Sequence, residues 1–317
     1  MIKFVLAEMT YLRYFMPLII EMNKRDIPLQ MLVGHNQKYN DPQKHMGMLK
    51  DLSKIHNIEM LDLNDNLCGE TFITVEGVLA QNIKGRVISL VALADFKFLY
   101  DRYIDYVDKV IFPSMFMAQY YDKVSDKNLY LGSPKYDVEL DGRLIRDKYG
   151  ILEKDRVVTV FAPNMGEINN FDFNQMYKTF SNMGYKIITK TRGKFVTPRD
   201  KRGDLYFEDS SWYPHASMEF IEISDFIVNF DSTTIKESVM LNTPIINFNI
   251  RGDKRRMSFL YEPDFCSMLD VLFKPEDIIQ VVETINNSDY RDSFSDVRDK
   301  YLFQRWSASK NIVDHLS

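Results

Sequence analysis

The sequence predicts an α/β fold built from two Rossmann-like domains, and three observations support this prediction. Short apolar runs alternate along the chain with segments whose apolar residues recur at helical spacing. The runs are apolar throughout, as expected for parallel strands that are buried on both faces. The chain has 317 residues, which is too long for one ordinary core and sufficient for two domains of roughly 150 residues each.

The apolar runs predict the strands, and the segments between them predict the helices. Strands are expected at residues 2–7, 28–33, 87–93, 109–112, 128–131, 157–162, 185–190, 226–230 and 244–248. Helices are expected at residues 11–24, 95–106, 174–183 and 234–241. This alternation is typical of βαβ units, which place ligand-binding loops at the carboxyl ends of the strands.

A domain boundary is expected where the alternation stops. Gly132-Ser133-Pro134 ends a strand, residues 135–155 are charged and contain no strand pattern, and Val157 begins the next strand. We therefore predict an N-terminal domain at residues 1–138 and a C-terminal domain with the last helices at residues 139–317, facing each other across a central cleft. Two-domain folds of this kind also allow a C-terminal helix to pack on the first domain.

Composition and charge exclude several classes of protein. Forty Lys and Arg against forty-five Asp and Glu give a net charge of −5, so contact with nucleic acid or a membrane surface requires a local patch. Cys68 and Cys266 fit neither a disulfide framework nor a paired metal site, which favours a reducing cytoplasm. No apolar run approaches the roughly 18 residues of a membrane span, so a cytoplasmic protein without a transmembrane segment is expected.

The motifs of several common chemistries are missing from the sequence. It contains no G-x-G-x-x-G, no G-x-x-x-x-G-K-[ST], no H-E-x-x-H, no G-x-S-x-G and no C-x-x-C. Its five histidines show no i, i+3 or i, i+4 spacing, and it has no D-x-D triplet. We therefore expect no metal ion, and a chemistry that relies on backbone amides, hydroxyls and fixed cations.

A turn rich in hydroxyl groups follows the strand expected at residues 226–230. The turn is Asp231-Ser232-Thr233-Thr234, and a helix is expected to begin there. Free amides at a helix start, together with the positive end of the helix dipole, bind phosphate, and the hydroxyls add donors. A structural role is the alternative, because Ser and Thr are common helix caps and Thr234-x-x-Glu237 fits a capping box.

Two cations, a turn and an aromatic pair add to this candidate phosphate site. Lys190 and Arg192 lie two residues apart at a strand end and therefore on one side, where they suit a diphosphate or form a solvated basic loop. Asn164 lies in the turn that ends the first strand of the second domain. This turn could let a ligand approach the backbone, or it could serve only to reverse the chain. Trp212 and Tyr213 can stack on a nucleobase or pack on the core.

These segments resemble the GT-B-fold enzymes, especially CDP-glycerol glycerophosphotransferases and non-hydrolysing UDP-N-acetylglucosamine 2-epimerases. The resemblance covers roughly residues 105–260. It rests on Leu131-Gly132-Ser133-Pro134-Lys135-Tyr136-Asp137, Phe161-Ala162-Pro163-Asn164, Lys190-Thr191-Arg192, Ser224-Asp225, Asp231-Ser232-Thr233-Thr234, Glu237 and Thr243-Pro244.

The resemblance implies a nucleotide-donor site in the second domain and an acceptor site in the first. By this resemblance the Ser232–Thr234 hydroxyls would hold phosphate, Glu237 a ribose hydroxyl, and Lys190 or Arg192 the diphosphate. The full set of donor-site candidates is Gly132, Pro134, Asn164, Lys190, Arg192, Trp212, Tyr213, Asp231, Ser232, Thr233, Thr234 and Glu237.

The leading hypothesis from the resemblance is a metal-independent glycosyltransferase that uses a nucleotide-diphosphate sugar as co-substrate. A surface glycan is the acceptor that the family implies, and modified DNA stays open because residues 192–202 and 251–256 contain basic segments. A UDP-sugar 2-epimerase and a CDP-polyol phosphotransferase of the same fold are alternatives. A non-catalytic binder of nucleotide sugars or nucleic acid is a further alternative.

A catalytic base is expected on a loop at the carboxyl end of a first-domain strand. Glu8 follows the first expected strand, His35 the second and Asp95 the long apolar run, whereas Glu70 has no expected strand before it. Glu8 and Asp95 could instead cap the helices that follow them, and His35 could be a turn residue. We favour Glu8, because GT-B enzymes that resemble this chain often place the base just past the first strand, and rank Asp95 second.

Overall fold

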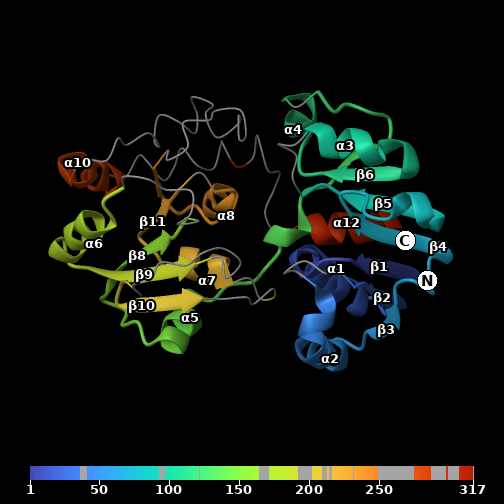
Figure 1. Ribbon diagram of the computed structural model, residues 1–317, viewed down its shortest axis with the longest axis horizontal. Helices are drawn as coiled ribbons and strands as arrows, with labels where there is room; N and C mark the ends of the chain where they lie inside the picture. Colours follow the sequence, from blue (N-terminus) through green and yellow to red (C-terminus); the bar gives the residue numbers. More distant parts are fainter. Residues whose placement is uncertain are drawn as a thin grey trace. The chain divides into compact units, whose positions relative to one another are not determined.

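The protein is described from a computed structural model, in which the chain forms two compact units (Figure 1). Unit 1 comprises Met1–Val138, a short segment around Tyr213 and a C-terminal segment, and unit 2 comprises the rest of the chain. The structure describes residues 1–35, 41–92, 97–120, 122–163, 171–191, 202–208, 213, 216–230, 232–248, 275–286, 298 and 307–316. The cleft expected between the domains stays a prediction.

Unit 1 contains a seven-stranded parallel sheet in the order β3-β2-β1-β4-β5-β6-β7. Its strands are β1 (Ile2–Leu6), β2 (Leu29–Val33), β3 (Glu59–Asp62), β4 (Cys68–Val75), β5 (Lys84–Leu90), β6 (Lys109–Phe112) and β7 (Asn128–Tyr130). Its α-helices are α1 (Leu12–Asn23), α2 (Met46–Ile55), α3 (Lys97–Tyr103), α4 (Met115–Tyr120) and α12 (Ala308–Leu316). Its 3-10 helices are η1 (Met9–Tyr11), η2 (Pro42–His45), η3 (Ala80–Asn82), η4 (Ile104–Tyr106) and η5 (Pro134–Tyr136).

Unit 2 contains a five-stranded parallel sheet in the order β10-β9-β8-β11-β12. Its strands are β8 (Arg156–Phe161), β9 (Tyr185–Thr191), β10 (Leu205–Glu208), β11 (Phe226–Asn229) and β12 (Ile245–Asn247). Its helices are α5 (Gly142–Tyr149), α6 (Phe173–Asn182), α7 (Ala216–Glu222), α8 (Thr234–Met240) and α10 (Pro275–Asn286). Both sheets are parallel and mixed with helices, so the predicted α/β class with two Rossmann-like domains is confirmed.

The core of unit 1 forms where α1 packs on β1. Successive side chains of a strand point to opposite faces, and both faces of β1 are buried: Phe4 belongs to the cluster around α1, and Val5 to a second cluster. The rings of Phe4 and Phe15 lie 5.2 Å apart between their centroids. The sequence could show this strand because every buried position in it is apolar.

The C-terminal helix belongs to unit 1, whereas the predicted second domain ran from residue 139 to 317. Ile312 and Val313 of α12 are fully buried in the same cluster as α1. Asp137 follows η5 and accepts a hydrogen bond from the backbone N–H of Ser309, 2.5 Å away, in the first turn of α12. Apolar burial and this cap together hold α12 on unit 1, an arrangement that residue order along the chain does not reveal.

Three strands, β3, β4 and β10, do not correspond to any predicted strand. In β4 the residues Cys68–Glu70 are exposed and only the second half is buried, so its sequence lacks a continuous apolar run. In β3 and β10 each residue is exposed or half-buried, because each strand lies at the edge of its sheet. Among the described residues, no helix is both long and apolar enough to cross a bilayer.

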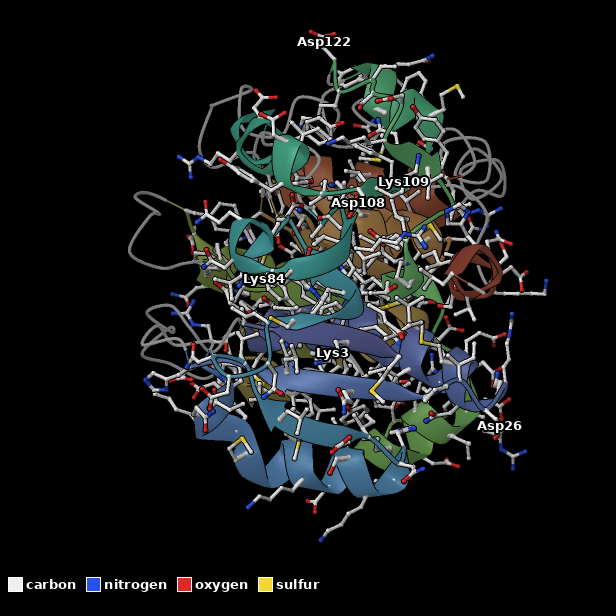
Figure 2. All side chains as sticks on the ribbon, turned by 90° about the vertical axis from the view of Figure 1, so that its right-hand side faces the viewer. Lys3, Asp26, Lys84, Asp108, Lys109 and Asp122 are labelled. Carbon is white, nitrogen blue, oxygen red and sulfur yellow. The ribbon has the colours of Figure 1, made fainter. Side chains whose placement is uncertain are left out.

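Several charged side chains lie at the edge of the unit 1 sheet where its strands begin. Lys3, Lys84 and Lys109 lie near the starts of β1, β5 and β6, at the side of the sheet that Figure 2 faces. Asp108, just before β6, accepts a hydrogen bond from the backbone N–H of Val87 at 2.6 Å and so ties the start of β6 to the middle of β5. The candidate functional residues lie at the opposite edge, where the parallel strands end.

Candidate functional site

The strand order of unit 2 makes the ends of β8 and β11 a candidate position for a ligand. These strands are neighbours, and the chain leaves β8 toward β9 on one side and β11 toward β12 on the other. In open parallel α/β sheets such a reversal leaves a crevice outside the carboxyl ends of the two strands, and ligands bind there.

The hydroxyl turn lies at this position. Ser232 follows β11 and is buried, and its Oγ lies 3.1 Å from Thr234 Oγ1. Thr233 is the N-cap residue of α8 and makes no side-chain capping hydrogen bond, and Thr234 lies within the helix. The capping box considered for Thr234 and Glu237 therefore does not form, although Glu237 is buried in the first turn of α8.

A buried amide supports the backbone of this turn. Asn229 is the last residue of β11 and is fully buried. Its Nδ2 donates to the carbonyl of Ser232 at 3.2 Å and to Asn247 Oδ1 at 2.9 Å, which ties the turn to the end of β12. Hydrogen bonds of this kind fix a binding loop before the ligand arrives.

Lys190 lies on the other side of β8 from the hydroxyl turn. It pairs in register with Phe161 at the end of β8, its carbonyl accepts from the N–H of Ala162 at 2.9 Å, and its side chain is buried. Lys190 and Asn229, the last residue of β11, are thus two strand spacings apart, about 10 Å, and the hydroxyl turn follows Asn229. A lysine side chain and a hydroxyl turn at this separation can both reach a diphosphate placed over the end of β8.

Several predicted donor-site residues fall outside the described residues, namely Asn164, Arg192, Trp212 and Asp231. Their assignments stay predictions. Tyr213 is described, is half-buried and packs against the core cluster of unit 1. The nucleobase-stacking role considered for it also stays a prediction.

Gly132 and Pro134 lie in unit 1, in the connection that leads from β7 to η5. Gly132 has a φ of +91°, a conformation that favours glycine, and Pro134 is the first residue of η5. This segment positions Asp137, whose carboxylate caps α12. Its structural role is visible, and its contact with a donor stays a prediction.

The unit 1 sheet reverses its strand order between β1 and β4, and Glu8 lies at the carboxyl end of β1. Its backbone is extended, and its side chain makes no capping hydrogen bond to η1, the alternative role considered for it. Thr10 Oγ1 donates to Glu8 Oε2 at 3.4 Å. The structure therefore places Glu8 where a catalytic base is expected, and its role stays a prediction.

Glu76 is a second carboxylate at this position, and the sequence did not suggest it. It directly follows β4, with a φ of +51°, and its Oε1 accepts from the backbone N–H of Ala92 at 2.6 Å. Burial, followed by the charges of Glu8 and Glu76, raises the pKa of the Tyr11 phenol. The two carboxylates follow the neighbouring strands β1 and β4. Val75-Glu76-Gly77 carried no signal because β4 was not predicted.

The other candidate bases, Glu70, His35 and Asp95, lie at different kinds of position. Glu70 lies within β4, is exposed and forms an ion pair with the amino group of Met1, so it is not at a strand end. His35 follows β2, and its Nδ1 lies 3.3 Å from Asp41 Oδ2. Asp95 lies outside the described residues. Within the described part of the chain, no group of three His, Cys, Asp or Glu side chains could hold a metal ion.

No protein-family model matches the sequence, and a search of curated proteins finds no match. Solved structures do match. A variant of the wall teichoic acid polymerase TagF aligns with a TM-score of 0.65 and 14% identity, over 99% of this chain and 87% of that chain. The UDP-GlcNAc 2-epimerase of Methanocaldococcus jannaschii, in complex with UDP-GlcNAc and UDP, aligns with a TM-score of 0.60 and 14% identity, over 99% and 98%.

A further UDP-N-acetylglucosamine 2-epimerase aligns with a TM-score of 0.66 and 14% identity, over 99% of this chain and 94% of that chain. The chain has a GT-B-like fold. The resemblance inferred from the sequence, to glycerophosphotransferases and epimerases of this fold, is thereby confirmed at the level of the fold. In this GT-B-like chain both sheets carry polar candidate residues at the carboxyl ends of their central strands.

Proposed function

We propose that this chain is a metal-independent glycosyltransferase that uses a nucleotide-diphosphate sugar, with the donor bound by unit 2. The observation that carries the proposal is the placement of Lys190 and the Ser232–Thr234 turn on either side of the end of β8. Fixed hydroxyls and cations in a partly buried crevice stabilise a leaving diphosphate without a metal ion. The GT-B-like fold agrees with this assignment, since its solved relatives include an epimerase in complex with UDP-GlcNAc and UDP.

The roles follow from the chemistry of each group. Lys190, with Arg192 following on the same chain segment, balances the charge of the diphosphate, and the Ser232–Thr234 hydroxyls donate to phosphate oxygens. Glu237 accepts from a ribose hydroxyl. In an inverting transfer Glu8 removes the proton of the acceptor hydroxyl, that oxygen bonds to the anomeric carbon, and the bond from this carbon to the diphosphate breaks.

A UDP-sugar 2-epimerase is the second candidate, and a specific observation favours it. Epimerisation needs several carboxylates to move protons and no acceptor, and in unit 1 Glu8 and Glu76 follow the neighbouring strands β1 and β4. Solved epimerases are among the structures that share the fold. Product analysis separates this candidate from the first.

The test is incubation of the full chain with UDP-, CDP-, GDP- and dTDP-activated sugars and with CDP-glycerol, followed by measurement of released nucleotide. Release that requires an added acceptor supports glycosyl transfer, and release of CMP from CDP-glycerol indicates polyol phosphate transfer instead. A 2-epimeric sugar product without an acceptor indicates an epimerase. Activity that is lost in excess EDTA and restored by magnesium or manganese would contradict the metal-independent mechanism.

A further inference from the structure

Two asparagine side chains form a buried pair at the carboxyl ends of β11 and β12. Asn229 and Asn247 are partners in the register of these parallel strands, so their side chains lie on the same face of the sheet. Both are buried, Asn229 completely. The Nδ2 of Asn229 donates to Asn247 Oδ1 and to the carbonyl of Ser232. The pair therefore connects the end of β12 with the hydroxyl turn.

The surroundings of this amide pair are apolar. The other residues of the two strands are all apolar and buried, namely Phe226, Ile227, Val228, Ile245 and Ile246. Val228 and Ile246 belong to the core cluster on one face of the sheet, so the pair lies on the opposite face. Two amides at such a position lose their contact with water, and apolar side chains would fill the same space without that cost.

The hydrogen-bonding capacity of Asn229 is only partly used. Its Oδ1 is buried and has no hydrogen-bond partner among the described residues, which destabilises the folded state. The opposite orientation of the amide would bring this oxygen against the carbonyl oxygen of Ser232, and the bond to the turn would be lost. Native proteins tolerate such unsatisfied groups mainly where function requires them. The bond to the hydroxyl turn is therefore the feature that explains the pair.

The strands and the helix beside the turn have supports of their own. The backbone N–H of Phe248 donates to the carbonyl of Asn229 at 2.9 Å, so the ladder between β11 and β12 does not depend on the side chains. Ile235 and Val239 are fully buried and hold α8 in place. The carbonyl of Ser232 also accepts from the N–H of Ile235, but at 3.3 Å, longer than a typical bond. Loss of the amide pair should therefore loosen the turn and leave the sheet intact.

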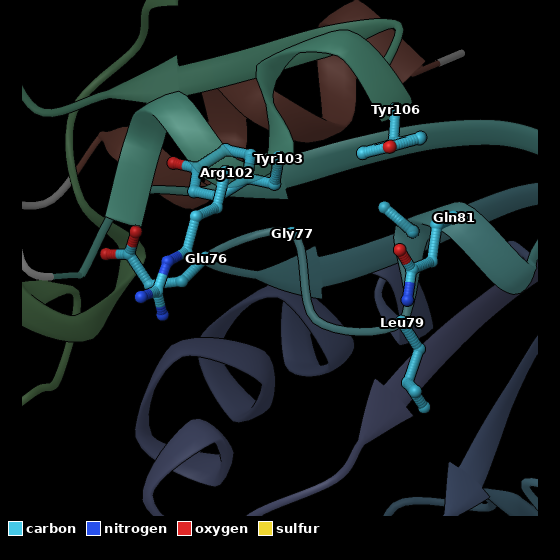
Figure 3. A pocket seen from close by; sticks show the side chains of 8 residues that line it. Glu76, Gly77, Leu79, Gln81, Arg102, Tyr103 and Tyr106 are labelled. Atoms are coloured by element: carbon cyan, nitrogen blue, oxygen red, sulfur yellow. The ribbon is translucent and has the colours of Figure 1, made fainter. Parts of the chain in front are cut away.

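Polar groups elsewhere in the chain have partners that explain them within the fold. A pocket of about 310 Å³ lies beside the β4–β5 connection of unit 1. Figure 3 shows the guanidinium of Arg102 beside the carboxylate of Glu76 there, so these two charges compensate each other. In unit 2 the buried hydroxyls of Thr159 and Ser224 bond to each other at 2.8 Å. Asn229 differs, because its amide serves a turn that follows the sheet.

We infer that Asn229 and Asn247 are positioning residues, present to hold the Ser232–Thr234 turn in one conformation rather than to stabilise the fold. Asn229 acts through the carbonyl of Ser232, and Asn247 orients the Asn229 amide. That the held conformation is the one that binds the diphosphate rests on the proposed function. A turn that adopts this conformation only about a tenth of the time would bind its ligand roughly ten-fold more weakly.

The test replaces the pair by apolar side chains in the double variant Asn229→Leu/Asn247→Ala. Leu has the branching of Asn, and Ala makes room for its larger methyl groups. The midpoint of urea unfolding should not decrease, because the unpartnered Oδ1 is removed. The affinity for the nucleoside diphosphate that binds the unaltered chain most tightly should fall roughly ten-fold or more in calorimetry. Thr159→Val is the matched control, since it removes a buried hydroxyl of the same unit away from the turn.

Amide exchange, followed by NMR without nucleotide, is compared between the Ser232–Thr234 turn and the strand β11. This comparison separates a loosened turn from a less stable sheet, and the double variant should exchange at least roughly ten-fold faster in the turn alone.

Faster exchange confined to the turn, with weaker nucleotide binding and an unchanged control, supports the inference. Unchanged exchange in the turn overturns it, and so does an affinity equal to that of the unaltered chain. An equal loss of affinity in Thr159→Val also overturns it, because any weakening of unit 2 would then be sufficient. If the unaltered chain binds no nucleotide, the proposed function is refuted, and exchange in the ligand-free chain still decides whether the pair holds the turn.

Discussion

Lys190→Met removes a buried positive charge at the carboxyl end of β9 and keeps the length of the side chain. Lys190 is 8% exposed and lies two strand spacings, about 10 Å, from Asn229, which ends β11 just before the hydroxyl turn. A charge-assisted hydrogen bond contributes about 1.5–3 kcal/mol, so the variant should bind nucleoside diphosphate roughly ten- to a hundred-fold more weakly. Because Lys190 is buried, the free energy of unfolding of the variant is measured beside its affinity, so that weaker binding is not confused with a less stable fold.

The assay is isothermal titration calorimetry with UDP, CDP, GDP and dTDP. Lys186→Met is the matched control, because Lys186 is on the same strand but near its amino end, where it pairs with Asp155. This control should bind nucleotide with unchanged affinity. If Lys190→Met binds every nucleotide as tightly as the unaltered chain, the diphosphate does not lie over the end of β8 and the reasoning is refuted.

Three further substitutions test other parts of the account. Glu8→Gln should lower turnover roughly a hundred-fold or more and leave donor affinity nearly intact; turnover near the original rate would show that the base lies elsewhere. Gly77→Ala should lower the free energy of unfolding, measured in urea, by about 2–5 kcal/mol, because alanine is strained at the left-handed φ of Gly77 and its Cβ would clash with Tyr103. Gly150→Ala is the control: Gly150 has a φ of +66° but open space around it, so its free energy of unfolding should fall by only about 1–2 kcal/mol. If α12 completes the unit 1 core, Ile312→Ala should lower the free energy of unfolding by about 2–5 kcal/mol. The control Ile279→Ala, at an exposed position, should lower it by less than about 0.5 kcal/mol.

Most strands that the sequence predicted are buried on both faces, although β7, at the edge of its sheet, is mostly half-buried. Such strands as β1, β8 and β11 consist of apolar runs with a recognisable length, so their carboxyl ends could be located from the sequence. The positions of Glu8, Lys190 and the hydroxyl turn followed directly from those ends.

The residues that the sequence missed depend on half-exposed elements. Strand β4 begins with exposed residues and was not predicted, so nothing pointed to Glu76, and Glu70 was a candidate base with no expected strand before it. The docking of α12 on α1 depends on contacts between segments almost 300 residues apart, such as the ion pair of Arg25 with Asp314. A local pattern contains no information about such a partner.

Hydrogen exchange with and without bound nucleotide tests the central claim most directly. Ligand at a hundred times its Kd stabilises the folded chain by about 2.7 kcal/mol, which slows exchange in the segments that it holds closed. The account predicts slower exchange at the end of β9, in the Ser232–Thr234 turn and in α8 when a saturating nucleoside diphosphate is added to the full chain. Slower exchange confined to unit 1, or none at any nucleotide concentration, would contradict a donor site in unit 2.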